Sequence, residues 1–275
     1  MARRVAYLAV PALVVLSTVL SSCALFKFER RAEWRGDAEQ ACMAARPFRR
    51  DNFIEQLRPI REELVCGMSK PLSVTALNDG TVVVGPTATI GCPMAVALEQ
   101  WLEGSVRQAA WTRLGSQVVG IHQLSSYACR GRNGVVGAQL SEHAFGNALD
   151  IASFELADGR TVSVEDDWSR GTQAERDFLR EILATACQYF NTVLGPGVEF
   201  HYDHFHLDLA HHNSAGTSRY CRPQISVPPM RTAEAPGDVI APFAFADEAR
   251  AATIIEPAAL AAGQAIGELI EALAQ

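Results

Sequence analysis

The chain has 275 residues, of which 48% are hydrophobic and 20% are charged. This composition is ordinary for a soluble globular protein and excludes a chain that lacks a packed core. Residues 1–22 carry two of the 24 basic residues and no acidic one, so the rest of the chain has 22 basic and 31 acidic residues. Its net charge of −9 argues against nucleic acid as a partner.

Residues 1–22 have the order of an export signal. Two arginines precede an apolar run over residues 5–20, which is shorter than the roughly 20 apolar residues that span a membrane. Residues 20–23 (LSSC) resemble a bacterial lipobox, in which the cysteine is acylated, so we expect Cys23 to anchor the protein to a membrane surface. The alternative is an ordinary cleaved signal. Ala24, where aspartate would favour the inner membrane, favours a location at the outer membrane, facing the periplasm.

Six cysteines follow Cys23, an even number in a chain predicted to reach an oxidising compartment. We therefore expect up to three disulfides. None of these cysteines forms a CxxC pair, which argues against a thiolate zinc cluster or a thioredoxin-like redox role, and the sequence leaves the pairing open. The six are Cys42, Cys66, Cys92, Cys129, Cys187 and Cys221.

The first half of the chain predicts a tether and the start of a folded domain. Residues 23–41 are rich in charge and lack a persistent apolar period, which is typical of a tether. We expect the folded domain over residues 42–222. Within it, the valine-rich residues 81–90 predict a strand, residues 93–115 a helix, and residues 117–123 a second strand.

The second half predicts a hairpin, a helix and a final strand. Residues 148–156 and 161–164 flank an Asp-Gly turn signal. Residues 172–175 have the spacing of a capping box and begin a helix. Residues 203–209 predict the last strand, so the domain is expected to be of the α+β class. The apolar face predicted for the helix consists of Phe178, Leu179, Ile182, Leu183 and Ala186.

The composition changes after the predicted domain. Prolines recur over residues 223–245, which predicts a linker. Residues 246–275 are rich in alanine and weakly amphipathic, which predicts a helical tail interrupted by Pro257.

Two segments concentrate residue types that bind metals: SEHAFGNALD at 141–150 and HYDHFH at 201–206. A hydrolytic zinc site uses three protein ligands from histidine and carboxylate and keeps a fourth position open for water. His143, Asp150 and one histidine of the second segment would supply this set. The glycine and asparagine between the first two permit a tight turn, so both side chains can face one ion.

Strand alternation distinguishes the histidines of the second segment. His204, His206 and Asp208 share one face of the predicted strand, and the residues between them point to the other face, toward the core. Only one histidine need bind zinc, which leaves the other to hydrogen-bond the attacking water or the developing oxyanion. We assign His206 to the metal and His204 to catalysis.

The pattern S-x-H-x-x-G-x-A-x-D over residues 141–150, followed by D-H-F-H over residues 203–206, resembles the zinc D-alanyl-D-alanine peptidases and murein endopeptidases of the Hedgehog-like fold. The resemblance implies an antiparallel sheet flanked by helices, with Ser141 close to the metal ligands. His201 matches a further active-site histidine of the murein endopeptidase branch. The zinc ligands that the resemblance implies are His143, Asp150 and His206.

A wider pattern resembles the bacterial extensin-like C-terminal family over roughly residues 42–221. The chain lacks the repeats of plant extensins, so the name of that family carries no functional weight. The segments that carry the resemblance are SYACR at 126–130, LSEHAFGNALDIASF at 140–154, VLGPG at 193–197 and HYDHFHLDLAHH at 201–212.

The identity of the general base stays open. The dipeptidase branch carries a glutamate three residues before the ligand histidine, where this chain has Asp203. The aspartate side chain is one methylene shorter than that of glutamate, and Asp203 lies on the opposite face of the predicted strand from His206. We therefore expect Asp203 to orient a histidine instead. His204 is the first candidate for the base and His201 the second. Arg130 would hold a substrate carboxylate or polarise the scissile carbonyl, unless it is a plain surface arginine.

These residues predict a zinc-dependent peptidase that hydrolyses amide bonds of peptidoglycan peptides in the bacterial envelope. An endopeptidase and a carboxypeptidase both fit, and an Arg130 that held a free carboxylate would favour the carboxypeptidase. One alternative is a wall-binding module that keeps zinc only for structure. Another is an envelope-assembly lipoprotein in which the Pro-rich linker and the C-terminal helix carry the function.

Overall fold

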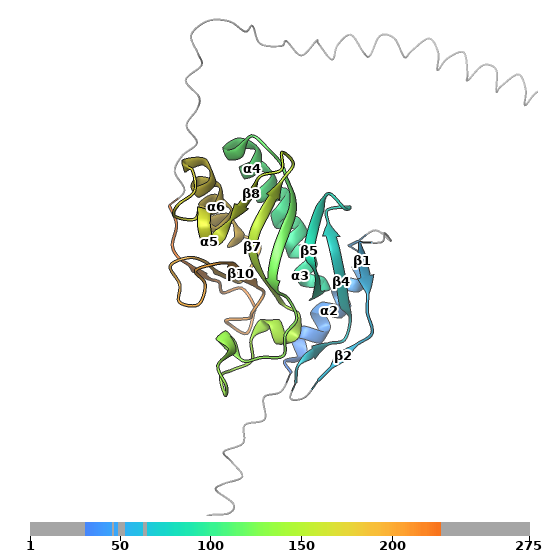
Figure 1. Ribbon diagram of the computed structural model, residues 1–275. Helices are drawn as coiled ribbons and strands as arrows, with labels where there is room; N and C mark the ends of the chain where they lie inside the picture. The colour runs from blue at the N-terminus through green and yellow to red at the C-terminus, as the bar shows by residue number, and fades with distance from the viewer. Residues whose placement is uncertain (1–30, 46, 49–52, 63–64, 227–275) are drawn as a thin grey trace, which may run out of the picture. The chain divides into compact units, whose positions relative to one another are not determined.

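The computed structural model describes residues 31–45, 47–48, 53–62 and 65–226 (Figure 1). The predicted export signal, Cys23, the linker beyond residue 226 and the C-terminal tail lie outside the described residues. Within the described ranges, no helix is both long enough and apolar enough to cross a bilayer.

One open sheet dominates the described part of the chain. It has nine strands there, in the order β1-β4-β5-β6-β7-β10-β9-β11, with β8 paired to β7. Neighbours are antiparallel except β5 with β6 and β9 with β11. The α+β class and the mainly antiparallel sheet are therefore confirmed. The strands are β1 (Ile54–Gln56), β4 (Pro71–Leu77), β5 (Val82–Gly91), β6 (Val118–Ser125), β7 (Ala148–Leu156), β8 (Thr161–Ser163), β9 (Thr192–Leu194), β10 (Phe205–Asp208) and β11 (Tyr220–Arg222), and a separate ribbon pairs β2 (Ile60–Arg61) with β3 (Gly67–Met68).

The predicted helix over residues 93–115 is present but is not uniform. It consists of α3 (Cys92–Trp101), a π-helical segment (Leu102–Val106) and α4 (Arg107–Leu114). A side chain at Gly104 would overlap the Tyr189 hydroxyl. Glycine therefore lets the π-helical segment approach closely to Tyr189, which follows the predicted second helix. A π segment adds one residue to the helical turn without ending the helix, which residue periodicity alone does not reveal.

Helix α6 (Gln173–Ala186) forms as its sequence predicts. Thr172 Oγ1 accepts a hydrogen bond from Glu175 N–H, and the Glu175 carboxylate accepts one from Thr172 N–H at 2.7 Å. This reciprocal pair satisfies two donors that the first turn of a helix leaves free. All five residues of the predicted apolar face are buried, so the capping box and the periodicity are both confirmed.

The hydrophobic core lies between one face of the sheet and helices α3, α4 and α6 (Figure 1). Trp101 is at its centre, with edge-to-face contacts to Phe154 and Phe190 at centroid distances of 6.1 and 5.9 Å. The Trp101 indole N–H donates to Ile182 O at 3.1 Å, so its polar group is satisfied in the interior. This packing fixes the position of β7 and β10, whose opposite faces carry the site.

Helix α2 (Glu33–Ala45) corrects the part of the predicted tether that the structure describes, residues 31–41. The helix already begins at Glu33 and packs against α3. Two links across the sequence hold it: the disulfide Cys42–Cys92 and a buried ion pair between Arg35 and Glu142, with N–O distances of 2.6 and 2.7 Å. A charge-rich stretch without a clear apolar period is thus ordered here by covalent and ionic contacts with distant residues.

Six of the described strands were not predicted: β1 to β4 in the first half of the chain, and the short strands β9 and β11 in the second half. β9 lies between helix α6 and the Gly-Pro-Gly segment at 195–197, and β11 follows β10, so the prediction that residues 203–209 form the last strand is wrong. Each has three residues, which is too short for an alternation pattern to be visible. β10 itself confirms the predicted strand over Phe205–Asp208.

All six cysteines that follow Cys23 are paired, which confirms the expected three disulfides. Cys42–Cys92 joins α2 to α3, Cys66–Cys129 joins the β3 region to the segment after β6, and Cys187–Cys221 joins the end of α6 to β11.

Candidate metal centre

The register of the sheet brings Asp150 and His206 together. Asp150 lies in β7, His206 lies in β10, and the two residues are direct partners in this antiparallel pair. Directly opposite residues project from the same face of a sheet. Their neighbours Ile151 and Phe205 are also partners and are buried in the core. The predicted alternation of β10 is therefore the feature that places His206 beside Asp150 and away from the core.

His143 reaches the same place from a 3₁₀ turn, Glu142–Phe145. Ser141 caps this turn, and its hydroxyl accepts from His143 N–H at 3.4 Å. The turn ends at Gly146, which has φ +62, and a side chain there would overlap Met68. Glycine at this position thus lets the chain reverse into β7 within a few residues of the histidine.

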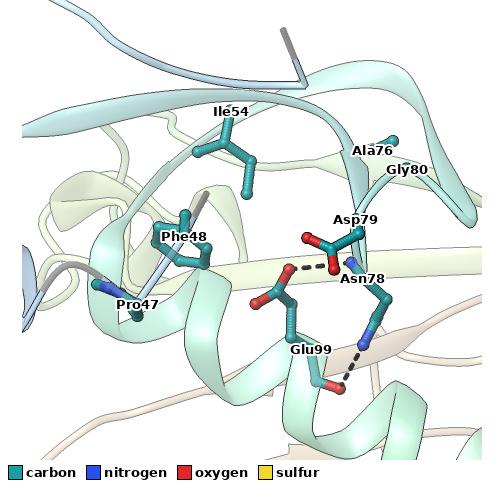
Figure 2. Close-up of a pocket in the computed structure, with 8 residues that line it drawn as sticks. All are labelled: Pro47, Phe48, Ile54, Ala76, Asn78, Asp79, Gly80 and Glu99. Atoms are coloured by element: carbon teal, nitrogen blue, oxygen red, sulfur yellow. Dashed lines mark hydrogen bonds between the residues drawn. The ribbon is translucent and has the colours of Figure 1, made fainter. Parts of the chain in front are cut away.

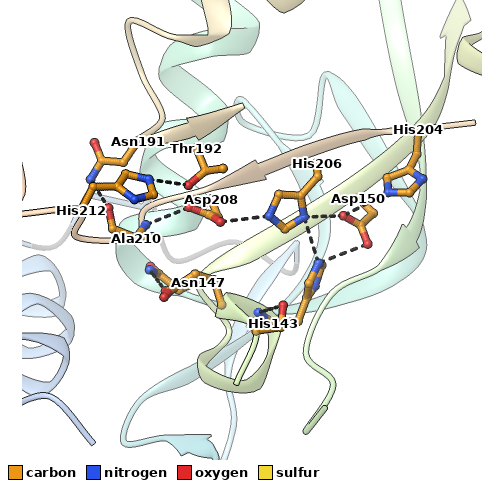
Figure 3. A network of polar contacts seen from close by, with 12 residues as sticks. His143, Asn147, Asp150, Asn191, Thr192, His204, His206, Asp208, Ala210 and His212 are labelled. Carbon is orange, nitrogen blue, oxygen red and sulfur yellow. Dashed lines mark hydrogen bonds and ion pairs between the residues drawn. The ribbon is translucent and has the colours of Figure 1, made fainter. Parts of the chain in front are cut away.

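The three side chains converge on one point (Figure 3). His143 Nε2 lies 3.1 Å from Asp150 Oδ2, His206 Nδ1 lies 2.8 Å from Asp150 Oδ1, and the two imidazole nitrogens are 3.3 Å apart. One ligand atom from each residue falls within 4.8 Å of the others. This spacing allows a single metal ion to contact all three.

The outer nitrogens of both histidines are already bonded. His143 Nδ1 lies 2.6 Å from Ser126 O, and because a carbonyl only accepts, the proton is on Nδ1. His206 Nε2 donates to Asp208 Oδ2 at 2.9 Å. In their neutral forms the two rings therefore turn lone pairs toward the Asp150 carboxylate. Such outer partners are typical of metal-binding histidines, because they fix the tautomer and the orientation of the ring.

The lone pairs of His143 Nε2 and His206 Nδ1 and the Asp150 carboxylate are three hydrogen-bond acceptors in close contact. They repel one another unless a positive charge lies among them. Burial by itself would raise the pKa of Asp150, yet the close polar contacts of its carboxylate with the His143 and His206 imidazoles hold it well below its usual range. Burial would likewise lower the pKa of His206, but the carboxylates of Asp150 and Asp208 raise it to about 10. Without a bound cation, the cluster therefore keeps an extra proton on His206. A metal ion can supply the same charge.

The remaining predicted site residues surround this cluster. His204 Nδ1 pairs with Asp203 Oδ1 at 2.7 Å, and His204 Nε2 lies 3.7 Å from Asp150 Oδ1. Buried His201 donates from Nδ1 to a backbone carbonyl, and its ring centroid lies 5.2 Å from that of His204. Arg130 Nη2 lies 3.6 Å from Asp150 Oδ2. The fold thus brings every predicted site residue except Cys23, which lies outside the described residues, to one place.

Burial also sets the charge of His201. It lowers the pKa of this histidine, and the neighbouring His206 and His204 lower it further, although the hydrogen bond to Glu199 O opposes them. His201 therefore favours the neutral form, with the proton on Nδ1 and a lone pair on Nε2.

The cluster opens into a cavity of about 540 Å³. The cavity is large enough for a ligand of several residues or sugar units. Its walls include Arg130, Arg132, Ser141, Phe200, His204 and Tyr220, so charged, polar and aromatic groups all face it.

A second cavity, of about 340 Å³, lies between the turn after β4 and helix α3 (Figure 2). Asn78 N–H donates to Glu99 Oε1 at 2.9 Å, and Asn78 Nδ2 donates to Glu99 O at 3.2 Å. These bonds tie the turn to the helix. Its described lining residues include Asp79 and Glu99 but no histidine or cysteine, so the histidines of the described residues are not gathered there.

Two important partners were not assigned a role from the sequence. Asp208 orients His206 and also accepts from Ala210 N–H at 2.9 Å. Its position two residues after His206, on the same strand face, was a usable signal. Arg35 holds Glu142, the neighbour of His143, from 107 residues away, and nothing in the sequence links them.

The family model described as extensin-like protein C-terminus matches residues 40–222. The chain belongs to this family. The match covers the candidate metal ligands His143, Asp150 and His206, the cavity and all three disulfides of this extensin-like domain. Searches among curated proteins and among solved structures found no match.

Proposed function

We propose that this extensin-like domain is a zinc-dependent peptidase that hydrolyses amide bonds in bacterial peptidoglycan. Two histidines and one carboxylate form one of the ligand sets that catalytic zinc sites use. The motif residues around them resemble those of zinc D-alanyl-D-alanine peptidases and murein endopeptidases of the Hedgehog-like fold. The export signal and lipobox support a location in the envelope, where this substrate lies.

The observation that carries the proposal is the combination of a three-residue ligand set with an open cavity. Structural zinc sites are closed by four protein ligands, whereas catalytic ones have three and leave a position for water. His143, Asp150 and His206 are the three, and the cavity gives access to them. When bound, zinc would polarise a carbonyl and lower the pKa of a water molecule.

In this proposal two histidines move a proton beside that position. Asp203 accepts from His204 Nδ1, so the neutral ring carries its lone pair on Nε2, which lies 3.7 Å from Asp150 Oδ1. His201 presents its Nε2 in the same way, because Glu199 O accepts from its Nδ1. Either imidazole can take a proton from an attacking water and return it to a leaving amine.

In this proposal Arg130 holds the substrate. Its side chain is about one-third exposed and lines the cavity beside Asp150. A guanidinium presents several N–H donors in one plane, which suits a carboxylate or a carbonyl oxygen of the chain to be cut.

The test is digestion of purified peptidoglycan sacculi by the zinc-loaded chain from residue 24, with fragments identified by mass spectrometry. We expect cleavage by the wild type and by His122→Ala, a matched control because His122 is an exposed histidine of β6. His206→Ala should lose both zinc and cleavage. Intact sacculi with a full equivalent of zinc in the wild type would contradict the proposal and favour a non-catalytic wall-binding module.

His204→Ala separates the two functions further. If His204 moves protons, the variant keeps one zinc per chain and loses cleavage. If His204 instead closes the site as a fourth ligand, the variant loses zinc affinity to the same extent as His143→Ala, as a structural zinc site requires. Zinc affinity by chelator competition, measured on both variants, distinguishes these outcomes.

A further inference from the structure

Phe200 has a backbone conformation that its side chain disfavours. It is the third residue of a four-residue turn closed by His201 N–H, which donates to Val198 O at 3.0 Å. Its φ is +67. This position of a turn ordinarily carries glycine or asparagine, and a bulky side chain at positive φ is a strained exception. The strain is therefore specific to the residue type at this position.

The fold accounts for the turn but not for the ring. The turn brings His201 to the cavity, and it also places Glu199 O where His201 Nδ1 can donate to it at 2.8 Å. Glycine or asparagine at position 200 would allow the same turn with less strain. The Phe200 side chain is 54% exposed, and it is not among the residues packed against either described hydrophobic cluster. Burial therefore offsets little of the strain.

Phe200 lines the cavity that contains the metal cluster. Strain that a fold does not need is characteristic of ligand-binding positions, where the surrounding structure maintains it for function. An exposed aromatic ring at the wall of such a cavity offers a flat apolar face to whatever enters.

We infer that Phe200 is a specificity-determining residue whose ring binds the C–H-rich face of the substrate group next to the scissile amide. This inference rests on the proposed peptidase function. A peptidoglycan fragment has two sources of such a face: an alkyl side chain of the stem peptide and the pyranose ring of the attached sugar. Both make the same contact with an aromatic face, and the substrate chosen for the assay distinguishes them.

The experiment compares three variants on two soluble substrates, a disaccharide-peptide and the sugar-free peptide of the same sequence. Phe200→Asn removes the ring and suits positive φ, and Phe200→Tyr keeps the ring. Tyr202→Asn is the matched control, because Tyr202 is an exposed aromatic residue of the same segment, at 62%, that does not line the cavity. The readouts are kcat, KM, zinc content and melting temperature.

A ring that binds substrate and transition state equally affects KM more than kcat. We expect Phe200→Asn to raise KM roughly tenfold, or about 1.4 kcal/mol, with kcat changed less than about twofold. Phe200→Tyr and Tyr202→Asn should keep the wild-type KM. Phe200→Asn should also keep its zinc and melt at or above the wild-type temperature. An effect on both substrates assigns the contact to the stem peptide, and an effect on the disaccharide-peptide alone assigns it to the sugar.

An unchanged KM on both substrates in Phe200→Asn would overturn the inference. A lower melting temperature in Phe200→Asn but not in Phe200→Tyr would also overturn it, because the ring would then be structural. If the zinc-loaded wild type cleaves neither substrate, the peptidase proposal fails separately. Calorimetric binding of the same two compounds then decides the role of the ring: weaker binding by Phe200→Asn supports the inference, and equal binding overturns it.

Discussion

Replacing Asp208 by asparagine should weaken metal binding although Asp208 is not itself a proposed ligand. The Asp208 carboxylate accepts from His206 Nε2–H at 2.9 Å and from Ala210 N–H at 2.9 Å. An amide of the same shape has only one oxygen. If this oxygen faces His206, the amide N–H₂ opposes Ala210 N–H. If it faces Ala210, the N–H₂ opposes His206 Nε2–H and favours the tautomer with the proton on the ligand atom Nδ1.

The magnitude follows from the loss of one charged partner. Removing a carboxylate that orients a metal-binding histidine typically costs about 10- to 100-fold in metal affinity. This range corresponds to about 1.4–2.8 kcal/mol and agrees with the roughly 1.5–3 kcal/mol of a hydrogen bond to a charged group.

Zinc affinity by competition with a chromophoric chelator, at constant pH and salt, measures this loss. Asp203→Asn is the control, because Asp203 pairs with His204 and contacts no proposed ligand directly, and its zinc affinity should stay within about twofold of the wild type. A wild-type zinc affinity in Asp208→Asn would refute the argument that this carboxylate fixes the ligand tautomer.

Three further predictions test the cluster and its supports. Because the pKa of His206 is raised to about 10, this residue is protonated at pH 7 without metal. Zinc binding should therefore release about one proton, and zinc affinity should rise as the pH rises toward that pKa. Calorimetry in buffers of different ionisation enthalpy counts the released proton. Arg35→Ala leaves the Glu142 carboxylate buried without its cation and should lower the free energy of unfolding by about 3–5 kcal/mol in urea titrations. Cys66→Ser opens the disulfide to Cys129, which closes a loop of 63 residues, and should cost about 4 kcal/mol of unfolding free energy by the same assay.

The sequence was most informative where short-range rules apply. The alternation of β10 predicted that His206 faces the site while Phe205 enters the core, and the capping box predicted the start of helix α6. Both patterns depend only on residues within a few positions of each other. The short interval between His143 and Asp150 belongs to the same class, because a tight turn is its simplest geometry.

The sequence was least informative where contacts join distant residues. The number of cysteines predicted three disulfides, but their pairing depends on distances that only the folded chain defines. Helix α2 was predicted as a tether because its order depends on Cys92 and Glu142, which lie far along the chain. The strain at Phe200 was equally hidden, since a positive φ at a phenylalanine contradicts local preference.

The segment from Ser126 to Arg130 contacts the candidate site and contains Cys129, one of the two cysteines of the Cys66–Cys129 disulfide. Ser126 O accepts from His143, Ala128 N–H donates to His143 O at 3.2 Å, and Arg130 faces the cluster. The disulfide Cys66–Cys129 adds a covalent restraint to this segment. A chain that folds under reducing conditions lacks this covalent restraint beside the proposed metal position, so we expect metal binding to be weaker before the disulfide has formed.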